Sequence, residues 1–93
     1  MLEIKQDKVE FIEVKIEDKV YKINLLTMLT VDDINLMRKA AKGGEDAELD
    51  WGFNYIKKFI PEKVFKTLQL SSVVAIFTEL KKQSAKSGLS LGE

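Results

Sequence analysis

Two short stretches near the N-terminus alternate apolar and polar residues on either side of a charged segment. In residues 12–16 the apolar side chains alternate with Glu and Lys, and in residues 21–25 they alternate with Lys and Asn. A period of two places every second side chain on the same face of a strand, so each stretch predicts a strand with one buried face. Between them, Glu17, Asp18 and Lys19 predict the turn of a β-hairpin. Because a hairpin alone is only marginally stable in water, its apolar face must pack on the rest of the chain.

Helical spacing dominates the sequence after the hairpin. A first helix is predicted to begin after Thr30, which is a residue type that caps helices, and to end at the glycine pair 43–44. A second helix is predicted over about residues 46–59, and Pro61 then breaks its pattern.

The last third of the chain predicts two further helices. A short helix is expected over residues 61–68, because Pro suits the first helical position. Ser71 or Ser72 is predicted to cap the last helix, and Gly88 can end it. The apolar stripe of this last helix consists of Val73, Ile76, Phe77 and Leu80.

These elements predict an α+β fold in which an N-terminal β-hairpin packs on a bundle of about four helices. Residues 2–6 allow a third short strand beside the hairpin. A length of 93 residues is typical of one domain. We expect residues 1–83 to form this single α+β domain, and residues 84–93, which are rich in Gly and Ser, to form a flexible C-terminal tail.

The composition removes the most common catalytic groups. The chain has no Cys and no His, so it lacks a thiolate nucleophile, the commonest general base and the commonest zinc ligand. The five Ser residues after position 70 therefore leave only a Ser–Lys pairing open as a nucleophile. The sequence also has no apolar run of about 20 residues, as a membrane helix needs, and no signal-peptide pattern. We expect a cytoplasmic, non-catalytic protein with no cofactor and no metal.

An alternating acidic stretch raises the question of a calcium site. Asp46, Glu48 and Asp50 have the spacing of the first ligands of an EF-hand loop. With Asp46 at position 1, however, Trp51 falls where the loop needs Gly, and Lys57 falls where it needs Glu. The stretch is therefore interpreted as the acidic first turn of a helix, where the helix dipole favours anions.

The charge is unevenly distributed, although the net charge is zero. Residues 57–86 carry seven Lys against two Glu, whereas residues 45–50 carry four acids. A Lys-rich surface would suit a small regulatory or nucleic-acid-binding protein, and this is the alternative function. Arg is the residue favoured for contacts with phosphates and base edges, and Arg38 is the single Arg of the chain. Nucleic acid is therefore not the expected partner.

Aromatic and apolar side chains on the helices are the candidate partner-binding residues. Trp and Tyr are enriched at the energetic centres of interfaces. Here both lie beside the main apolar stripe of the second helix, which consists of Leu49, Phe53, Ile56 and Ile60. The stripe of the last helix is broadened by one further Val, so part of that face is expected to stay outside the core, although a stripe that is wholly core remains an open alternative. The predicted partner-binding residues are Trp51, Tyr55, Val74, Phe77 and Leu80.

The order of the parts resembles a known family. Over residues 10–82, the layout and length are similar to the small tail assembly chaperones of long-tailed bacteriophages and prophages. The segments that carry the resemblance are the hairpin Val-Lys-Ile-Glu-Asp-Lys-Val-Tyr-Lys-Ile (14–23), Leu-Thr-Val-Asp-Asp-Ile (29–34), Phe-Ile-Pro-Glu-Lys-Val (59–64) and Leu-Ser-Ser-Val-Val-Ala-Ile-Phe-Thr-Glu-Leu (70–80).

The resemblance implies a specific set of partners. Such proteins bind the long helical tape measure protein in the infected bacterial cell, keep it soluble, and help tail tube subunits polymerise around it. They tend to self-associate, so a homo-oligomer is expected, and many are also made in a longer form by ribosomal frameshifting. A location in the cytoplasm of the bacterial host follows, with no membrane partner. A minor component of the virion is a third possibility.

Overall fold

The hairpin and the helices occur in the predicted order. A computed structural model describes residues 1–4 and 9–88 of the chain. The α+β fold with a hairpin packed on helices is confirmed. Of the third strand allowed at residues 2–6, residues 2–4 form no strand, and residues 5 and 6 lie outside the described part. The elements are β1 (Phe11–Ile16), β2 (Lys19–Asn24), the 3₁₀ helix η1 (Leu26–Met28), α1 (Val31–Lys42), α2 (Glu45–Ile56), α3 (Glu62–Phe65) and α4 (Leu70–Lys86).

A tight turn joins β1 to β2. The strands pair antiparallel, and Ile16 opposite Lys19 closes the hairpin with a loop of two residues. Both loop residues, Glu17 with φ of 45° and Asp18 with φ of 72°, adopt left-handed conformations. Positive φ at both positions is typical of a type I′ turn, whose twist matches that of the paired strands. The predicted turn is therefore confirmed, although its third residue already belongs to β2.

Local signals determine where α1 and α2 begin and end. Thr30 caps α1 as predicted, because its Oγ1 accepts a hydrogen bond from the Asp33 N–H at 3.3 Å. α1 ends at Gly43, and Gly44 starts α2 with φ of 109°, a conformation that residues with a side chain rarely adopt. The first turn of α2 is acidic, so the acidic stretch is the start of a helix, as predicted.

α4 begins earlier than predicted. Its N-cap is Gln69, so Ser71 and Ser72 lie inside the first turn and do not cap the helix. Gln69 makes no side-chain capping hydrogen bond. The prediction followed the preference of Ser for N-cap positions, but the helix includes Leu70, which starts an apolar strip described below.

α4 also continues beyond the predicted end of the domain. The helix reaches Lys86, and Gly88 follows it with φ of 103°. Ser84, the first residue of the predicted tail, is fully buried, and its Oγ accepts a hydrogen bond from the Leu26 N–H at 3.0 Å. The folded part therefore extends past residue 83, because this hydrogen bond ties the last turns of α4 to η1. Residues 89–93 of the predicted tail lie outside the described part.

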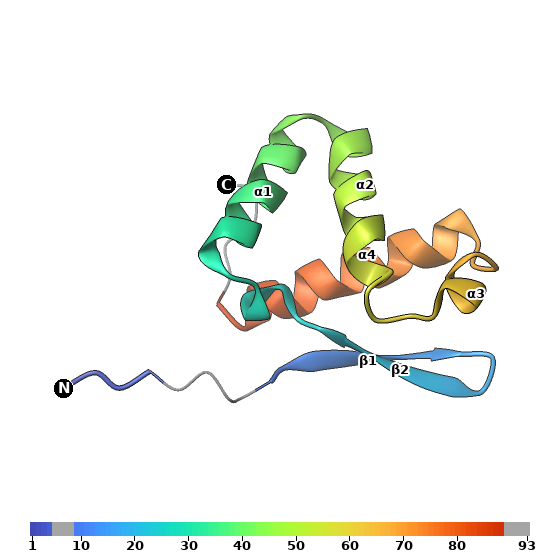
Figure 1. The fold of residues 1–93 in the computed structure, drawn as a ribbon, viewed down its shortest axis with the longest axis horizontal. Helices are drawn as coiled ribbons and strands as arrows, with labels where there is room; N and C mark the ends of the chain where they lie inside the picture. Colours follow the sequence, from blue (N-terminus) through green and yellow to red (C-terminus); the bar gives the residue numbers. More distant parts are fainter. Residues whose placement is uncertain (5–8, 89–93) are drawn as a thin grey trace.

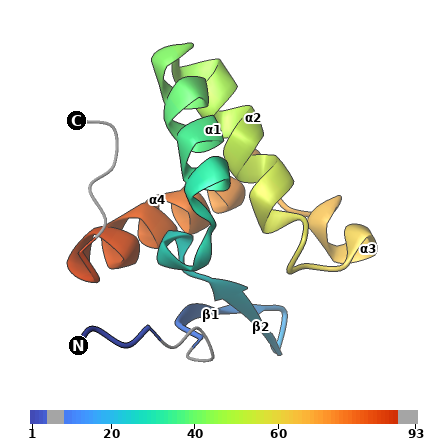
Figure 2. The same cartoon turned by 60° about the vertical axis from the view of Figure 1, so that its left-hand side comes forward.

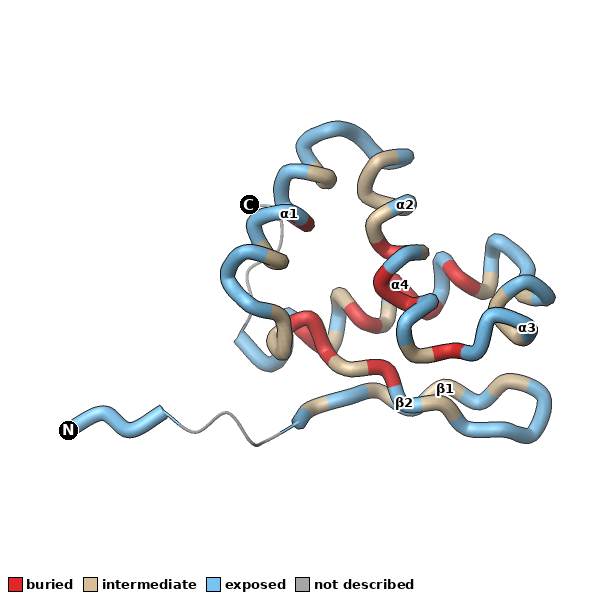
Figure 3. The backbone as a smooth tube through the Cα atoms, in the orientation of Figure 1, coloured by how far each residue is buried: buried red, intermediate tan, exposed pale blue. Residues whose placement is uncertain are grey.

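α4 lies between the other long helices and the β-hairpin (Figures 1 and 2). α1 and α2 run antiparallel on one side of α4, and the hairpin lies on the other. Figure 3 shows that the buried residues gather where these layers meet, whereas the connection between α1 and α2 is exposed. None of the described helices is long and apolar enough to cross a membrane. The fully buried apolar side chains are Ile23, Leu26, Ile56 and Leu80.

Candidate functional site

Four aromatic rings join α2 to α4. Trp51 stacks on Tyr55, with ring centroids 5.4 Å apart and ring planes 7° apart. The ring centroids of Tyr55 and Phe59 lie 5.2 Å apart, and those of Trp51 and Phe77 of α4 lie 6.3 Å apart. Such ring pairs stabilise a core beyond the apolar area that they bury. Trp51 is half-buried at the edge of this cluster, so it contributes to the core and keeps one part of its surface exposed.

Tyr55 anchors the end of β2. Its side chain is buried, and its hydroxyl group donates a hydrogen bond to the carbonyl oxygen of Asn24 at 2.7 Å. Burial raises the pKa of Tyr55 to about 12, because the charged phenolate would lose its hydration. The structure thus gives this residue a role inside the fold.

Three of the five predicted partner-binding residues are core residues. Tyr55, Phe77 and Leu80 are each at most 5% exposed, which corrects the prediction that their side chains are accessible to a partner. The physical reason is the position of α4, which is covered from two sides and therefore buries its whole stripe. Trp51 is half-buried, and Val74 is 38% exposed, so these two are the residues of the predicted set that reach the surface.

An apolar groove opens where α2, α3 and α4 meet. Its volume is about 330 Å³, which is within the range of small binding pockets. Short connections bring the three elements together, because Pro61 ends the continuation of α2 and leads directly into α3. The groove is lined by Phe53, Lys57, Phe65, Lys66, Leu68, Leu70 and Val73.

Two rings form the aromatic part of the groove. Phe53 of α2 and Phe65 of α3 meet edge to face, with centroids 6.5 Å apart and planes at 71°. The Nζ of Lys57 lies 5.7 Å from the Phe65 centroid, which is within cation–π range. Leu70, the first residue of α4, is 63% exposed beside these rings. A large exposed apolar side chain next to an aromatic groove is typical of a surface that binds a partner.

The charged part of the groove is basic. Lys57 and Lys66 both line it, and Lys66 pairs with Glu62 at 3.2 Å on the surface of α3. An ion pair between exposed side chains contributes little free energy, so a carboxylate from a partner can compete for Lys66. The groove therefore offers apolar contacts together with positive charge.

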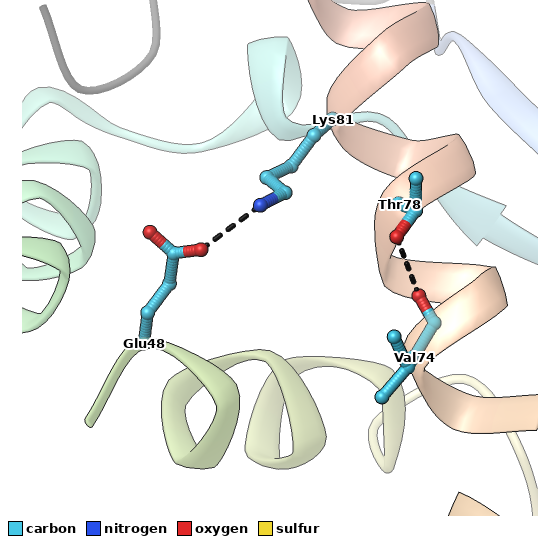
Figure 4. A network of polar contacts seen from close by, with 4 residues as sticks. All are labelled: Glu48, Val74, Thr78 and Lys81. Atoms are coloured by element: carbon cyan, nitrogen blue, oxygen red, sulfur yellow. Dashed lines mark hydrogen bonds and ion pairs between the residues drawn. The ribbon is translucent and has the colours of Figure 1, made fainter. Parts of the chain in front are cut away.

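The apolar surface continues from the groove along α4. Val74 follows Leu70 by four residues, so the two side chains lie on the same face of the helix. The strip ends at the polar residue Thr78, whose Oγ1 donates a hydrogen bond to the Val74 carbonyl oxygen at 2.8 Å (Figure 4). The next turn carries Lys81, whose Nζ is 2.9 Å from Oε1 of Glu48 on α2. Val74 is therefore an exposed continuation of the apolar strip that begins at Leu70.

A second hollow lies between η1, α1 and the end of α4. Its volume is about 410 Å³, and the buried Oγ1 of Thr27 beside it has no hydrogen-bond partner among the described residues. None of the described residues that line it is aromatic. The groove is therefore the better candidate for a binding site. The hollow is lined by Leu26, Thr27, Leu29, Val31, Ile34, Asn35, Arg38, Ser87 and Gly88.

The sequence did not reveal the groove. The late predicted start of the last helix left Leu70 in a loop. The signal that could have identified the strip is the spacing of Leu70 and Val74, which lie on a different face from the buried stripe of α4. A groove formed by three elements cannot be inferred from the periodicity of any one of them.

Comparisons with known proteins add no relative. A scan of protein-family models finds no match, and searches of curated proteins and of solved structures find none either. Within residues 1–4 and 9–88, no group of three or more His, Cys, Asp or Glu side chains is placed to hold a metal ion.

Proposed function

We propose that this chain is a non-catalytic protein-binding module that acts as a tail assembly chaperone of a long-tailed phage or prophage. In this role it binds the tape measure protein in the cytoplasm of the bacterial host and assists the assembly of tail tube subunits around it. The observation that carries the proposal is the apolar groove between α2, α3 and α4, with Leu70 exposed beside it.

The groove suits an amphipathic helix. Such a helix binds by laying its apolar face into a groove, with side chains one turn apart as anchors. The edge-to-face pair of Phe53 and Phe65 offers rigid aromatic surface, and Leu70 and Val74 extend this surface along α4. A long helical protein that has not yet assembled exposes apolar stripes of this kind, and covering them keeps it soluble.

The environment of the lysines favours a protein partner over nucleic acid. Lys81 of α4 pairs with Glu48 of α2 at 2.9 Å, and both side chains are partly buried. The Nζ of Lys57 lies over the ring of Phe65. A lysine that is already placed against a carboxylate or a ring gains less from a phosphate, so the Lys-rich half of the chain supports the nucleic-acid alternative less well.

A pair of Leu variants tests the groove. Leu70→Ser removes the exposed side chain beside the groove, and Leu36→Ser removes a similarly exposed Leu (58%) from α1 as the matched control. Burying a Leu side chain stabilises a complex by about 1.5–3 kcal/mol, so Leu70→Ser should weaken binding of a tape measure segment by at least about tenfold. Leu36→Ser should leave binding unchanged. Isothermal titration calorimetry with purified tape measure segments measures both.

The outcomes separate the alternatives. Equal binding by the two variants would show that the groove is not the binding site. If no tape measure segment binds, and DNA is retained with a strong dependence on salt, the nucleic-acid alternative replaces the proposal. Detection of the chain by mass spectrometry in purified phage particles would instead indicate a virion component, because a chaperone leaves the assembled tail.

A further inference from the structure

The outer edge of β1 has no backbone partner among the described residues. The sheet has two strands, and the Leu25 N–H continues their ladder by donating to the Glu10 carbonyl oxygen at 2.9 Å. Hydrogen-bonded and non-hydrogen-bonded pairs alternate along an antiparallel ladder, so Ile12, Val14 and Ile16 direct their N–H and C=O groups towards β2. The backbone groups of the alternate residues 11, 13 and 15 therefore point outward. This edge can accept another strand.

The sequence of β1 is complementary to itself. Glu13 and Lys15 are exposed on one face of the strand, one residue on each side of Val14. If a second β1 pairs antiparallel with Val14 opposite Val14, Glu13 of each copy lies opposite Lys15 of the other. These are the residues whose backbone groups point outward, so each such pair also exchanges two backbone hydrogen bonds.

Charge selects this register over its neighbours. A register centred on Glu13 would place the two Glu13 carboxylates opposite each other, and one centred on Lys15 would place the two ammonium groups opposite each other. Like charges directly opposite destabilise a strand pair, whereas unlike charges stabilise it. Among these three registers, the one centred on Val14 is therefore favoured.

The other edge of the hairpin is unsuited to the same contact. β2 carries Lys19 and Lys22 and no acidic residue. Lys on an edge strand is a common device that prevents pairing with other chains. The charges on the two strands thus favour pairing of a second copy with the edge of β1 and disfavour pairing with the edge of β2.

We infer that two copies of this chain pair through β1 and form a continuous four-stranded antiparallel sheet in the order β2–β1–β1–β2. The two-fold axis passes at Val14, which makes the interface isologous and closed. On the inner face, Ile12 of one copy lies opposite Ile16 of the other. The three half-buried apolar residues of β1, Ile12, Val14 and Ile16, therefore become more buried in the dimer. None of them lines the groove, so this inference is independent of the proposed function.

A charge swap tests the pairing. Lys15→Glu places two pairs of carboxylates opposite each other, and sedimentation equilibrium should show the dimer dissociation constant rising by about tenfold or more. The double variant Glu13→Lys with Lys15→Glu restores unlike pairs and should recover the dimer. Lys19→Glu changes the charge equally on β2 and should leave the dimer intact. A wild-type chain that stays monomeric at every concentration would overturn the inference, as would an equal loss in Lys15→Glu and Lys19→Glu.

A cross-link tests the register even if the swapped variant does not fold. The chain has no Cys, so Val14→Cys introduces a single thiol. Opposite residues in a non-hydrogen-bonded pair have Cα atoms about 4.5 Å apart, which is within the span of a disulfide. Under mild oxidation the Val14→Cys protein should form a disulfide-linked dimer much faster than Val20→Cys, although Val20 is more exposed (54%). Equal rates for the two variants would overturn the register.

Discussion

The ring of Phe77 packs directly on Gly52, at the point where α4 crosses α2. A Cβ atom at position 52 would lie 2.9 Å from Cδ2 of this ring, which is closer than real Cβ atoms approach. A Gly inside a helix costs roughly 1 kcal/mol relative to Ala, so the close approach of the two helices here outweighs helix propensity.

Gly52→Ala should therefore destabilise the protein by about 1–3 kcal/mol, because the added methyl group pushes the two helices apart. Urea denaturation measures the free energy of unfolding. In a Phe77→Leu background the methyl group has more room, so the same substitution should cost clearly less. The same cost in both backgrounds would contradict a direct contact between residues 52 and 77.

Tyr55 should make the stability fall at high pH. Its pKa is about 12 in the folded state against 10.0 for the free side chain, so above pH 10 the unfolded state loses a proton that the folded state keeps. The contribution of Tyr55 to the free energy of unfolding is fully present below about pH 10 and is lost as the pH rises towards 12. The loss amounts to about 2–3 kcal/mol at pH 12.

The variant Tyr55→Phe isolates this effect. It should be less stable than the wild type at pH 7 by about 1 kcal/mol, because the hydrogen bond to Asn24 is missing. The difference between the two proteins should shrink and then reverse between pH 10 and 12. Chemical denaturation at several pH values measures it, and a difference that stays constant would show that Tyr55 titrates normally.

Ser84 should be required for the full stability of the fold. A chain that ends at Gln83 lacks the hydroxyl group that accepts the Leu26 N–H, and an unpaired buried donor costs about 1–3 kcal/mol. A chain that ends at Gly88 keeps this contact and should match the full chain. Thermal denaturation compares them, and hydrogen exchange of the Leu26 amide should accelerate in Ser84→Ala. Equal stability of the two truncated chains would support a domain limit at residue 83.

Substitutions in the hairpin turn should increase the stability of the protein. Glu17 and Asp18 hold left-handed conformations that Asn and Gly adopt more readily. Glu17→Asn combined with Asp18→Gly should raise the free energy of unfolding by about 0.5–1 kcal/mol, which is a rise in melting temperature of a few degrees. Asp32→Gly, in the first turn of α1, is the control and should lower the melting temperature. A loss of stability in the turn variant would contradict the type I′ geometry.

Local patterns were sufficient to predict the hairpin and the order of the helices. The alternation around Val14 and Ile23 gave the hairpin, and the preference of Thr30 for N-caps gave the start of α1. The buried stripe of the last helix also follows its sequence spacing. Each of these features depends on neighbours within a few residues along the chain.

Features that depend on packing between elements were not predictable. Tyr55 lies off the main stripe of α2 but is buried, and its hydroxyl group reaches the end of β2, where it donates a hydrogen bond to the Asn24 carbonyl oxygen. Ser84 is polar and follows a Lys-rich segment, but its hydrogen-bond partner is 58 residues away in the sequence. Gly52 has a clear role only when the position of Phe77 is known.

The two hydrogen bonds that hold the chain between β2 and η1 have a consequence for synthesis of the protein. Asn24 accepts a hydrogen bond from Tyr55, and Leu26 donates one to Ser84. This segment is synthesised early, whereas its hydrogen-bond partners are synthesised much later. On the ribosome, the nascent hairpin emerges long before α4 can cover it, and such distant contacts close slowly. Until α4 has been synthesised and can pack against them, the apolar strands are therefore exposed to other components of the translating cell.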